Sequence, residues 1–481
     1  MAYILGIDIG TGSVKVVALD LNHTPIAVFQ EHYPAYSPEP GYSEQDPELI
    51  WQAFVRCILK TMAHLKGKPL AVGLSSAMHS VVAIDEHAHA LAPMMTWADN
   101  RSAPMAERLL SSGQGMLLYK VTGTPIHAMS PFCKLAWLSE QAPVLMKHTF
   151  KFIGIKEYIW HRLFGAYEVD HSIASSTGLF DIRQKIWHPA ALRTAGIRAE
   201  QLSDPVATSH TRRGHPLLAA SLPGLSGVPF VIGASDGCLA NLGTQAMRSG
   251  VAAITIGTSG AVRVASARPV ISESMVFSYL LDESTFICGG PVNNGGVVLQ
   301  WLLKNVFGKP ELRPADYEWL FKLAESVPPG SDGLIFLPYL SGERAPIWDA
   351  AASGSFSGLR LHHGQAHLAR AVLEGICYAL NDVLITLEQH AGPVKQVNVS
   401  GGFVHSVLWM QLLADITGKT LVLRQTEDAS ATGAAYLAAR ATGLSAGYPQ
   451  PPVDEIRISP DQQRHAVYLN RFALFRQRGA S

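Results

Sequence analysis

A carboxylate followed by a turn rich in glycine and hydroxyl groups stands near the N-terminus, in Asp8-Ile9-Gly10-Thr11-Gly12-Ser13-Val14-Lys15. Glycine lets a phosphate approach the backbone closely, and successive N–H groups in such a turn can bind it. Lys15 can supply a cation, and Asp8 can hold Mg²⁺ through the water shell of the ion. The segment therefore suits a phosphate group, although an ordinary hairpin turn has a similar composition. It is not a Walker A loop, because the required G-x-x-x-x-G-K-[ST] spacing is absent from the chain.

Two further loops have the same character, Gly257-Thr258-Ser259-Gly260 and Ser400-Gly401-Gly402-Phe403. The first offers backbone and hydroxyl donors without a carboxylate. The second joins a predicted strand to a predicted helix, and the N-terminus of a helix is a favourable place for a phosphate. Many strand-to-helix connections look like this second loop, but the three loops together predict a nucleotide site.

Phosphoryl transfer also needs a group that accepts the proton of the attacking hydroxyl. Asp236 is the candidate, because it ends the apolar run 231–235 and precedes the second half of the chain. A carboxylate there is expected on the floor of a cleft between two domains. Asp236 could instead cap the helix that follows it, and the two roles are compatible.

Two other clusters suit a polyol or a sugar acid. Met78-His79 follows a predicted buried strand, and Trp97-Ala98-Asp99-Asn100-Arg101 combines a stacking surface with charged hydrogen-bonding groups. The second cluster could equally be an Asp99–Arg101 pair at the surface beside a core tryptophan. The paired histidines at 87 and 89 and at 362 and 363 lack further ligands, so we expect no metal there.

Composition limits the function classes. The chain has 481 residues with 38 basic and 38 acidic side chains, and this zero net charge argues against nucleic-acid or membrane partners. Five scattered cysteines without C-x-x-C spacing indicate neither a zinc site nor a disulfide framework, which favours a reducing compartment. No signal peptide or membrane span is evident, so we expect a cytoplasmic protein.

The length predicts at least two domains, and the pattern of elements restarts near residue 250. This repetition suggests an internal duplication, although short similarities between two segments also arise by chance. We predict mixed sheets and helices in two halves joined near residue 245. The expected strands are 3–8, 14–20, 26–29, 69–74, 81–84, 251–256 and 261–265, with 81–84 continuing the first sheet, and the expected helices are 48–65, 367–387 and 407–417.

Two longer motifs now identify a resemblance to the FGGY carbohydrate kinases along essentially the whole chain. The segment 129–141, MSPFCKLAWLSEQ, fits the first signature of that family, and 357–375 is similar to the second. The resemblance implies an α/β fold of two ribonuclease H-like domains, of the actin/hexokinase ATPase type, with a cleft between them. It also implies that residues 1–245 bind the sugar and residues 246–481 bind ATP.

The resemblance further implies roles for individual residues. Asp236 would be the general base, and Asp8 and Asp236 would be associated with Mg²⁺. The residues expected to bind ATP are Thr11, Gly12, Ser13, Lys15, Gly257, Thr258, Ser259, Gly296, Gln300, Gly401, Gly402 and Ser406. The residues expected to bind the sugar are Met78, His79, Trp97, Asp99, Arg101, Met129 and Asp236.

Within the family, several segments look most like the gluconate kinases, among them 78–80, 96–102, 123–127, 292–296 and 342–346. The expected reaction is the conversion of D-gluconate to 6-phosphogluconate, and a homodimer is common among relatives. The substrate carboxylate requires a cation, for which His79, His127, Arg101 and Lys156 are available. A kinase for xylulose or another ketopentose, and a non-catalytic ATP- or sugar-binding regulator, are the alternatives.

Overall fold

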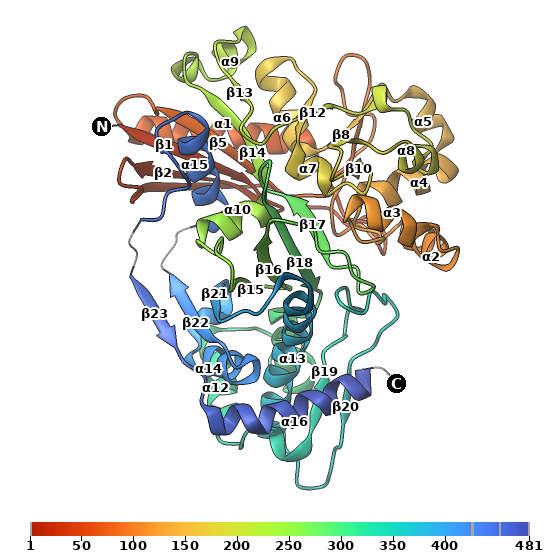
Figure 1. The fold of residues 1–481 in the computed structure, drawn as a ribbon, viewed down its shortest axis with the longest axis vertical. Coiled ribbons are helices and arrows are strands. Elements are labelled where there is room, and N and C mark those ends of the chain that lie inside the picture. The colour runs from red at the N-terminus through yellow and green to blue at the C-terminus, as the bar shows by residue number, and fades with distance from the viewer. Residues whose placement is uncertain (1, 425–427, 452–453, 480–481) are drawn as a thin grey trace.

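The computed structural model describes residues 2–424, 428–451 and 454–479. Most of its strands form two large sheets, one in each half of the chain (Figure 1). In order across the first sheet these are β13 (Thr211–Arg212), β14 (Phe230–Ser235), β5 (Ala71–Ser76), β1 (Tyr3–Ile9), β2 (Ser13–Asp20) and β3 (Pro25–His32). In the second they are β17 (Phe277–Leu280), β18 (Phe286–Val292), β16 (Gly260–Ser266), β15 (Val251–Ile256), β21 (Gln396–Ser400), β22 (Thr420–Arg424) and β23 (Glu455–Ile458).

The two sheets share one central topology. In the first, β1 pairs antiparallel with β2 and parallel with β5, and β5 pairs parallel with β14. In the second, β15 stands in the same relation to β16 and β21, and β21 pairs parallel with β22. The repeated order supports the internal duplication that the sequence suggested, and it agrees with the predicted α/β architecture.

Helices cover the sheets and build the outer layers. They are α1 (Pro47–His64), α2 (Ala103–Ser111), α3 (Gln114–Thr122), α4 (Pro131–Gln141), α5 (Pro143–His148), α6 (Ile155–Phe164), α7 (His171–Ser175), α8 (Pro189–Ala195), α9 (Pro216–Ser221), α10 (Asp236–Gly243), α11 (Gly296–Trp301), α12 (Pro314–Glu325), α13 (Gln365–Ala391), α14 (Val407–Thr417), α15 (Ala429–Ala441) and α16 (Gln462–Gly479). Short strands form two-stranded pairs beside them: β4 (Glu44–Gln45) with β7 (Met94–Met95), β6 (Val82–Ile84) with β8 (Lys151–Ile153), β9 (Glu168–Asp170) with β12 (Asp204–Val206), β10 (Phe180–Asp181) with β11 (Ile186–Trp187), and β19 (Ile335–Leu337) with β20 (Ser355–Ser357).

Most expected elements are present, with one clear exception. Helix α1 begins with Pro47 after the N-cap Asp46, whose carboxylate accepts a hydrogen bond from the N–H of Glu48 at 2.8 Å. Helix α14 ends at Gly418, whose φ of 67° suits glycine. The prediction that 81–84 continues the first sheet is wrong. Both edges of β5 are already paired, with β1 and β14, so β6 pairs with β8 instead.

Helix α15 lies on the first sheet although it belongs to the last part of the chain, and Figure 1 shows this blue helix among the red N-terminal strands. Glycines allow the close approach. A Cβ atom on Gly6 of β1 would lie 1.8 Å from the carbonyl oxygen of Ala431, and one on Gly73 of β5 would lie 2.1 Å from that of Ala434. Helices α10 and α15 are equally close, since a Cβ on Gly433 would lie 2.0 Å from the carbonyl oxygen of Leu239.

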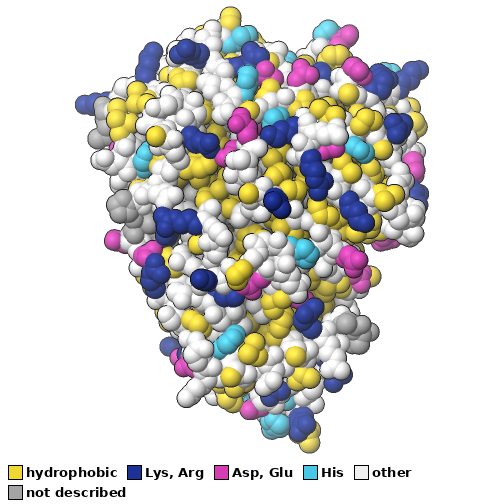
Figure 2. All heavy atoms as spheres, in the orientation of Figure 1, with side chains coloured by type: hydrophobic (Ala, Val, Ile, Leu, Met, Phe, Trp, Pro, Cys, Tyr) yellow, Lys and Arg dark blue, Asp and Glu magenta, His cyan; other side chains and the backbone are white. Residues whose placement is uncertain are grey.

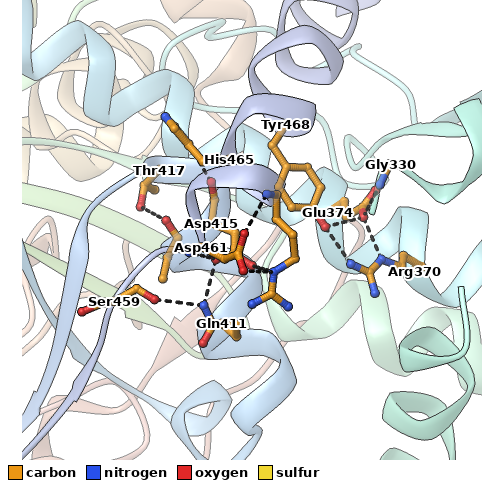
Figure 3. A network of polar contacts seen from close by, with 12 residues as sticks. Gly330, Arg370, Glu374, Gln411, Asp415, Thr417, Ser459, Asp461, His465 and Tyr468 are labelled. Atoms are coloured by element: carbon orange, nitrogen blue, oxygen red, sulfur yellow. Dashed lines mark hydrogen bonds and ion pairs between the residues drawn. The ribbon is translucent and has the colours of Figure 1, made fainter. Parts of the chain in front are cut away.

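A polar network fixes the C-terminal helix α16 to α13 and α14 (Figure 3). Arg370 donates to Glu374 at 2.9 Å and to the hydroxyl of Tyr468 at 2.7 Å, and that hydroxyl donates to Glu374 at 2.9 Å. Glu374 and Tyr468 are almost completely buried, and the Arg370 guanidinium forms an ion pair with the Glu374 carboxylate, so this buried charge is partnered.

The molecular surface has mixed charge. Side chains of both signs are scattered over the face shown in Figure 2, without one large patch of a single sign. Among the described helices, none combines the length and apolarity that crossing a bilayer requires.

Gly73→Ala is expected to destabilise the protein by about 3 kcal/mol or more, because the new methyl group would meet the backbone of α15. Gly227→Ala is the matched control, since a Cβ there has no heavy atom within 4 Å. Urea unfolding of both variants measures the difference. Equal stabilities would mean that the helix can move away from the sheet at little cost.

Candidate active site

A cavity of about 310 Å³ lies between segments of both halves of the chain, and we call it the central cavity. Loops after β1, β5 and β7, the segment before α4 and the start of α10 contribute one part of its wall. Strands β15 to β18, the loop after β15 and the loop around Arg344 contribute the rest. Its lining residues are Thr11, Met78, His79, Trp97, Met129, Asp236, Thr255, Gly257, Thr258, Ser259, Gly260, Ala261, Arg263, Phe277, Tyr279, Pro291 and Arg344. Four of the residues expected to bind the sugar, Met78, His79, Trp97 and Met129, meet Asp236 here.

A second cavity of about 870 Å³ adjoins the α10–α15 contact, and we call it the hinge cavity. It is lined by Pro25, Asp236, Gly237, Ala240, Thr255, Arg263, Ser400, Gly401, Val404, His405, Leu423, Arg424, Asp428, Ala429 and Ser430. Asp236, Thr255 and Arg263 line both this cavity and the central cavity. Asp236 therefore stands where the two spaces meet.

A third cavity of about 470 Å³ is rich in aromatic side chains, and we call it the aromatic cavity. Six residues expected to bind ATP line it, namely Gly257, Thr258, Gly296, Gln300, Gly402 and Ser406. Tyr317, Phe321 and Trp409 supply apolar surface there, which suits a flat ring. The hydroxyl of Ser406 caps α14 by accepting a hydrogen bond from the N–H of Trp409 at 3.3 Å.

Of the six remaining residues expected to bind ATP, three line one of these cavities, whereas Gly12, Ser13 and Lys15 line none of the three. Gly401 lines the hinge cavity, and Thr11 and Ser259 line the central cavity, where the Thr11 hydroxyl accepts a hydrogen bond from the Trp97 indole at 3.0 Å. Gly12 is exposed in the turn, and the Ser13 hydroxyl accepts a hydrogen bond from Gln30 at 2.8 Å.

Three carboxylates influence one another beside the hinge cavity. Asp8 lies at the end of β1 and accepts a hydrogen bond from the Ser75 hydroxyl at 2.6 Å. Burial and the carboxylates of Asp428 and Asp236 raise the pKa of Asp8 to about 8. Burial also raises the pKa of Asp236, against the opposing effect of the Arg263 guanidinium. A cation delivered with a ligand would relieve this concentration of negative charge.

Lys15 faces Asp8 across the β1–β2 pair, but its ammonium is committed to an ion pair with Asp428 at 2.8 Å. Asp428 also caps α15, because its carboxylate accepts a hydrogen bond from the N–H of Ala431 at 2.8 Å. Lys15 thus joins the first sheet to the helix that covers it, and it neutralises part of the carboxylate group.

These residues fit a magnesium ion held through water. The described part of the chain has no group of three or more His, Cys, Asp or Glu side chains arranged to hold a metal directly. Mg²⁺ commonly binds through one or two carboxylates, several waters and the phosphates of its nucleotide. Asp8 and Asp236, with their raised pKa values, suit that mode.

A buried ammonium organises one wall of the central cavity. The side chain of Lys134 in α4 donates to the carbonyl oxygens of His79 at 2.7 Å, Thr96 at 2.6 Å and Met129 at 2.8 Å. His79 and Met129 line the cavity, and Thr96 precedes Trp97, which does so too. His79 has a φ of 69°, an uncommon backbone conformation for a residue with a side chain. One side chain therefore sets the positions of three segments of the cavity wall.

Asp99 and Arg101 do not line the central cavity, in contrast to the expectation from the sequence. Arg101 forms ion pairs with Asp99 at 2.8 Å and Glu44 at 2.9 Å, and its guanidinium lies 3.9 Å from the ring centre of Tyr42. Asp99 is fully buried and also accepts a hydrogen bond from the N–H of Ser43. The pairing agrees with the alternative interpretation, but the pair is not at the surface, and Trp97 is half-buried and lines the cavity instead of belonging to the core.

The other cations expected for the substrate carboxylate are also unsuited to it. Lys156 forms a buried ion pair with Asp170 at 2.7 Å. Burial, with the Lys134 ammonium as the next contribution, lowers the pKa of His79 to about 3. Burial and the charge of Arg344 lower that of His127 to about 3, so both histidines are neutral at pH 7.

Sequence reasoning missed three residues of the site, Arg263, Arg344 and Asp428. Arg263 interrupts the apolar strand 261–265, which is an unusual position for an arginine and a usable signal. Asp428 precedes the alanine-rich stretch of α15, which is typical of an N-cap. Arg344 stands in an irregular loop, where only the fold brings it to the cavity.

Comparison with known proteins gives consistent matches. The N-terminal domain of the FGGY family of carbohydrate kinases matches residues 3–243, and its C-terminal domain matches residues 252–442. A gluconokinase of Bacillus subtilis is 42% identical over 452 residues, which cover 92% of this chain and 88% of that protein. These matches confirm the expected resemblance.

Two solved structures from Lactobacillus acidophilus match equally well, one of a gluconate kinase and one of a ligand-bound xylulose kinase. Each has a TM-score of 0.94 and 34% identity, and the match covers 99% of this chain and 97% of the other. They confirm the predicted two-domain fold of the actin/hexokinase type.

Asp8→Asn is expected to stabilise the protein free of Mg²⁺ and nucleotide at pH 8, by about 2 °C in Tm, while lowering activity. The folded-state pKa of Asp8, about 8, lies above the ordinary aspartate value of 3.8, so the folded state binds the proton more tightly. Stability lost to ionisation of Asp8 therefore grows as pH rises from about 4 to 8, and the gain should be smaller at pH 5.

Thermal unfolding with EDTA at the two pH values measures this effect. Glu86→Gln removes a carboxylate that is 77% exposed and serves as the control. A variant that gains no stability at pH 8 would show that Asp8 is not held in an unfavourable charged state.

Proposed function

The chain belongs to the FGGY family of carbohydrate kinases, and we propose that it transfers the γ-phosphoryl group of ATP to the 6-hydroxyl of D-gluconate. The protein is an enzyme that phosphorylates a small carbohydrate. The gluconokinase relative at 42% identity and the gluconate kinase structure support gluconate as the substrate.

The main support for this proposal is the position of Asp236 between two cavities. Its carboxylate lines both the central cavity, which collects the sugar-facing residues, and the hinge cavity beside the glycine loops. A hydroxyl in the first space and a phosphate in the second would therefore meet at Asp236. Its raised pKa also suits a group that must accept a proton at neutral pH.

In the proposed reaction, the adenine lies in the aromatic cavity and the triphosphate extends over Gly257, Thr258 and Gly401 toward Asp236. Bound Mg²⁺ would neutralise phosphate charge, with Asp8 and Asp236 holding its water shell. The 6-oxygen of gluconate bonds to the γ-phosphorus, the bond to the β-phosphate oxygen breaks, and Asp236 accepts the hydroxyl proton. Positioning contributes much of the rate, because the transition state of such a transfer is loose.

We assign sugar binding mainly to residues 1–245 and ATP binding mainly to residues 246–481. The glycine loop at 257–260 and the aromatic cavity support the second assignment. The central cavity also takes Arg263, Tyr279 and Arg344 from the C-terminal half, so both parts would contact the sugar.

We infer a reducing compartment, in agreement with the expected cytoplasmic location, because all five cysteines are free and buried. The homodimer expected from relatives remains a prediction.

A ketopentose such as xylulose is the second candidate substrate. The ligand-bound xylulose kinase of Lactobacillus acidophilus matches this chain as well as the gluconate kinase does. Both substrates present a terminal hydroxyl, so Asp236 could serve either one. The two differ in charge at the opposite end of the molecule.

A coupled ADP-release assay with MgATP distinguishes these substrates. Gluconate is expected to give a kcat/KM at least about 100-fold above those of xylulose, ribulose, glycerol and glucose, in keeping with loss of a charged hydrogen bond. A preference for xylulose would keep the kinase chemistry and overturn gluconate as the substrate.

Asp236→Asn is expected to lower kcat by about 10³-fold, because an amide cannot accept the hydroxyl proton. ATP binding, measured by calorimetry, should change little. Glu200→Gln, which alters a carboxylate 81% exposed at the surface, should retain full activity. Near-native kcat in Asp236→Asn would remove Asp236 from the role of general base.

A further inference from the structure

The central cavity contains two guanidinium groups, those of Arg263 and Arg344. Neither takes part in any ion pair found among the described residues, and the Nε atom of each is buried without a hydrogen-bond partner. Buried arginines are usually paired, because removing an unpaired charge from water is costly. The cavity therefore contains positive charge that the protein itself leaves incompletely partnered.

The two arginines lie at different parts of the site. Arg263 also lines the hinge cavity, and its charge is the main influence that opposes the rise in the Asp236 pKa. It thus stands at the end of the central cavity where the phosphate is transferred. Arg344 lines the central cavity and lies over the ring of Trp97, with 5.4 Å between its Cζ atom and the ring centre.

The protein holds Arg344 in place, but no carboxylate of the described residues forms an ion pair with its guanidinium. One guanidinium nitrogen donates to the carbonyl oxygen of Val292 at 3.2 Å, and the side chain is only 7% exposed. The adjacent carboxylate of Glu343 partly offsets the charge of Arg344, but its hydrogen bonds go to other groups than the guanidinium. It accepts hydrogen bonds from the backbone N–H groups of Asn293 at 2.5 Å and Arg344 at 2.8 Å, and from the Asn294 amide at 3.1 Å.

Besides Arg344, the charged side chains that line the central cavity are Arg263 and Asp236, and its other lining side chains are neutral. His79 and His127 are uncharged at pH 7, and Met78, Met129 and Phe277 are apolar. Burial lowers the pKa of Arg344 to about 10, which still leaves it charged at pH 7. An anion beside the Arg344 guanidinium would replace the favourable interaction with water that the guanidinium loses on burial.

We propose that Arg344 binds the carboxylate of the sugar-acid substrate and thereby selects sugar acids over neutral polyols. The inference rests on the proposed function for the identity of the acid. In this orientation the carboxylate lies by Trp97 and Arg344, and the far hydroxyl lies by Asp236. Arg263 is left to face the transferred phosphate. A planar guanidinium matches a carboxylate in two parallel hydrogen bonds, which a neutral hydroxymethyl group cannot reproduce.

Arg344→Gln tests this assignment with two ligands that differ in one group. D-glucitol has the carbon chain of D-gluconate but a hydroxymethyl group in place of the carboxylate. The variant is expected to bind gluconate about 30-fold more weakly, as loss of a charged hydrogen bond predicts, and to bind glucitol within about 3-fold of the wild type. Calorimetry and competitive inhibition measure both affinities without requiring turnover.

Three controls make the result specific. Arg344→Lys keeps the charge and should recover part of the preference for gluconate. Arg268→Gln removes the same charge from an exposed position and should change neither affinity. The KM for ATP in Arg344→Gln should stay within about 2-fold of the wild-type value, because the nucleotide lies elsewhere.

Equal weakening of gluconate and glucitol, or no weakening of gluconate, would overturn the assignment. If Arg344→Gln does not fold, the wild type decides, since a preference for gluconate over glucitol below about 10-fold would contradict a charged carboxylate site. Failure of the proposed function can be distinguished from failure of the Arg344 assignment. A wild type that binds gluconate through Arg344 but phosphorylates only a ketose would refute gluconate as the substrate and retain this site.

Discussion

The free energy of burying charge in the cleft is the constraint on which the arrangement of the site depends. Burial disfavours the charged forms of Asp8 and Asp236 at one end, and those of Arg263 and Arg344 in the adjoining space. Protein partners offset this cost only in part. In the proposed function, a cation with its phosphates would complement the carboxylates, and an anionic sugar would complement the guanidinium groups. Ligand binding would then supply the opposite charges that the protein lacks, which is one physical basis for selective binding.

Such an arrangement requires walls that do not relax when charges are unpaired. Lys134 supplies this rigidity in the wall of the central cavity, because one buried ammonium fixes three backbone carbonyls. On the other side, Gly6 and Gly73 let α15 lie directly on the first sheet, and the Lys15–Asp428 ion pair joins the same two elements. Asp236 begins α10, which packs on α15. The proposed base is thus positioned by contacts that allow little movement within this layer.

The sequence was sufficient for features that depend on neighbouring residues. Glycine loops, the strand-to-helix position of Asp236 and the pair Met78-His79 all have local signals. The structure brings Asp236, Met78, His79 and most of the glycine-loop residues to the cavities. Which charged residues form ion pairs was harder to predict from the sequence, because ion pairs depend on contacts between distant segments. Arg101 is neutralised by Asp99 and Glu44, whereas Arg344 lies in an irregular loop and reaches the cavity only through the fold. Residue type alone could not tell which arginine would lack a partner.

The position of α15 also has a consequence for the biosynthesis of the protein. Strands β1 and β5 end by residue 76, but the helix that covers them spans Ala429–Ala441. A ribosome therefore releases nearly the whole chain before the first sheet can bury that face. Contacts between such distant segments form slowly, and an apolar face exposed in the meantime favours aggregation. The N-terminal half should thus depend on chaperones during translation, and truncation before residue 429 should leave it unable to complete its own core.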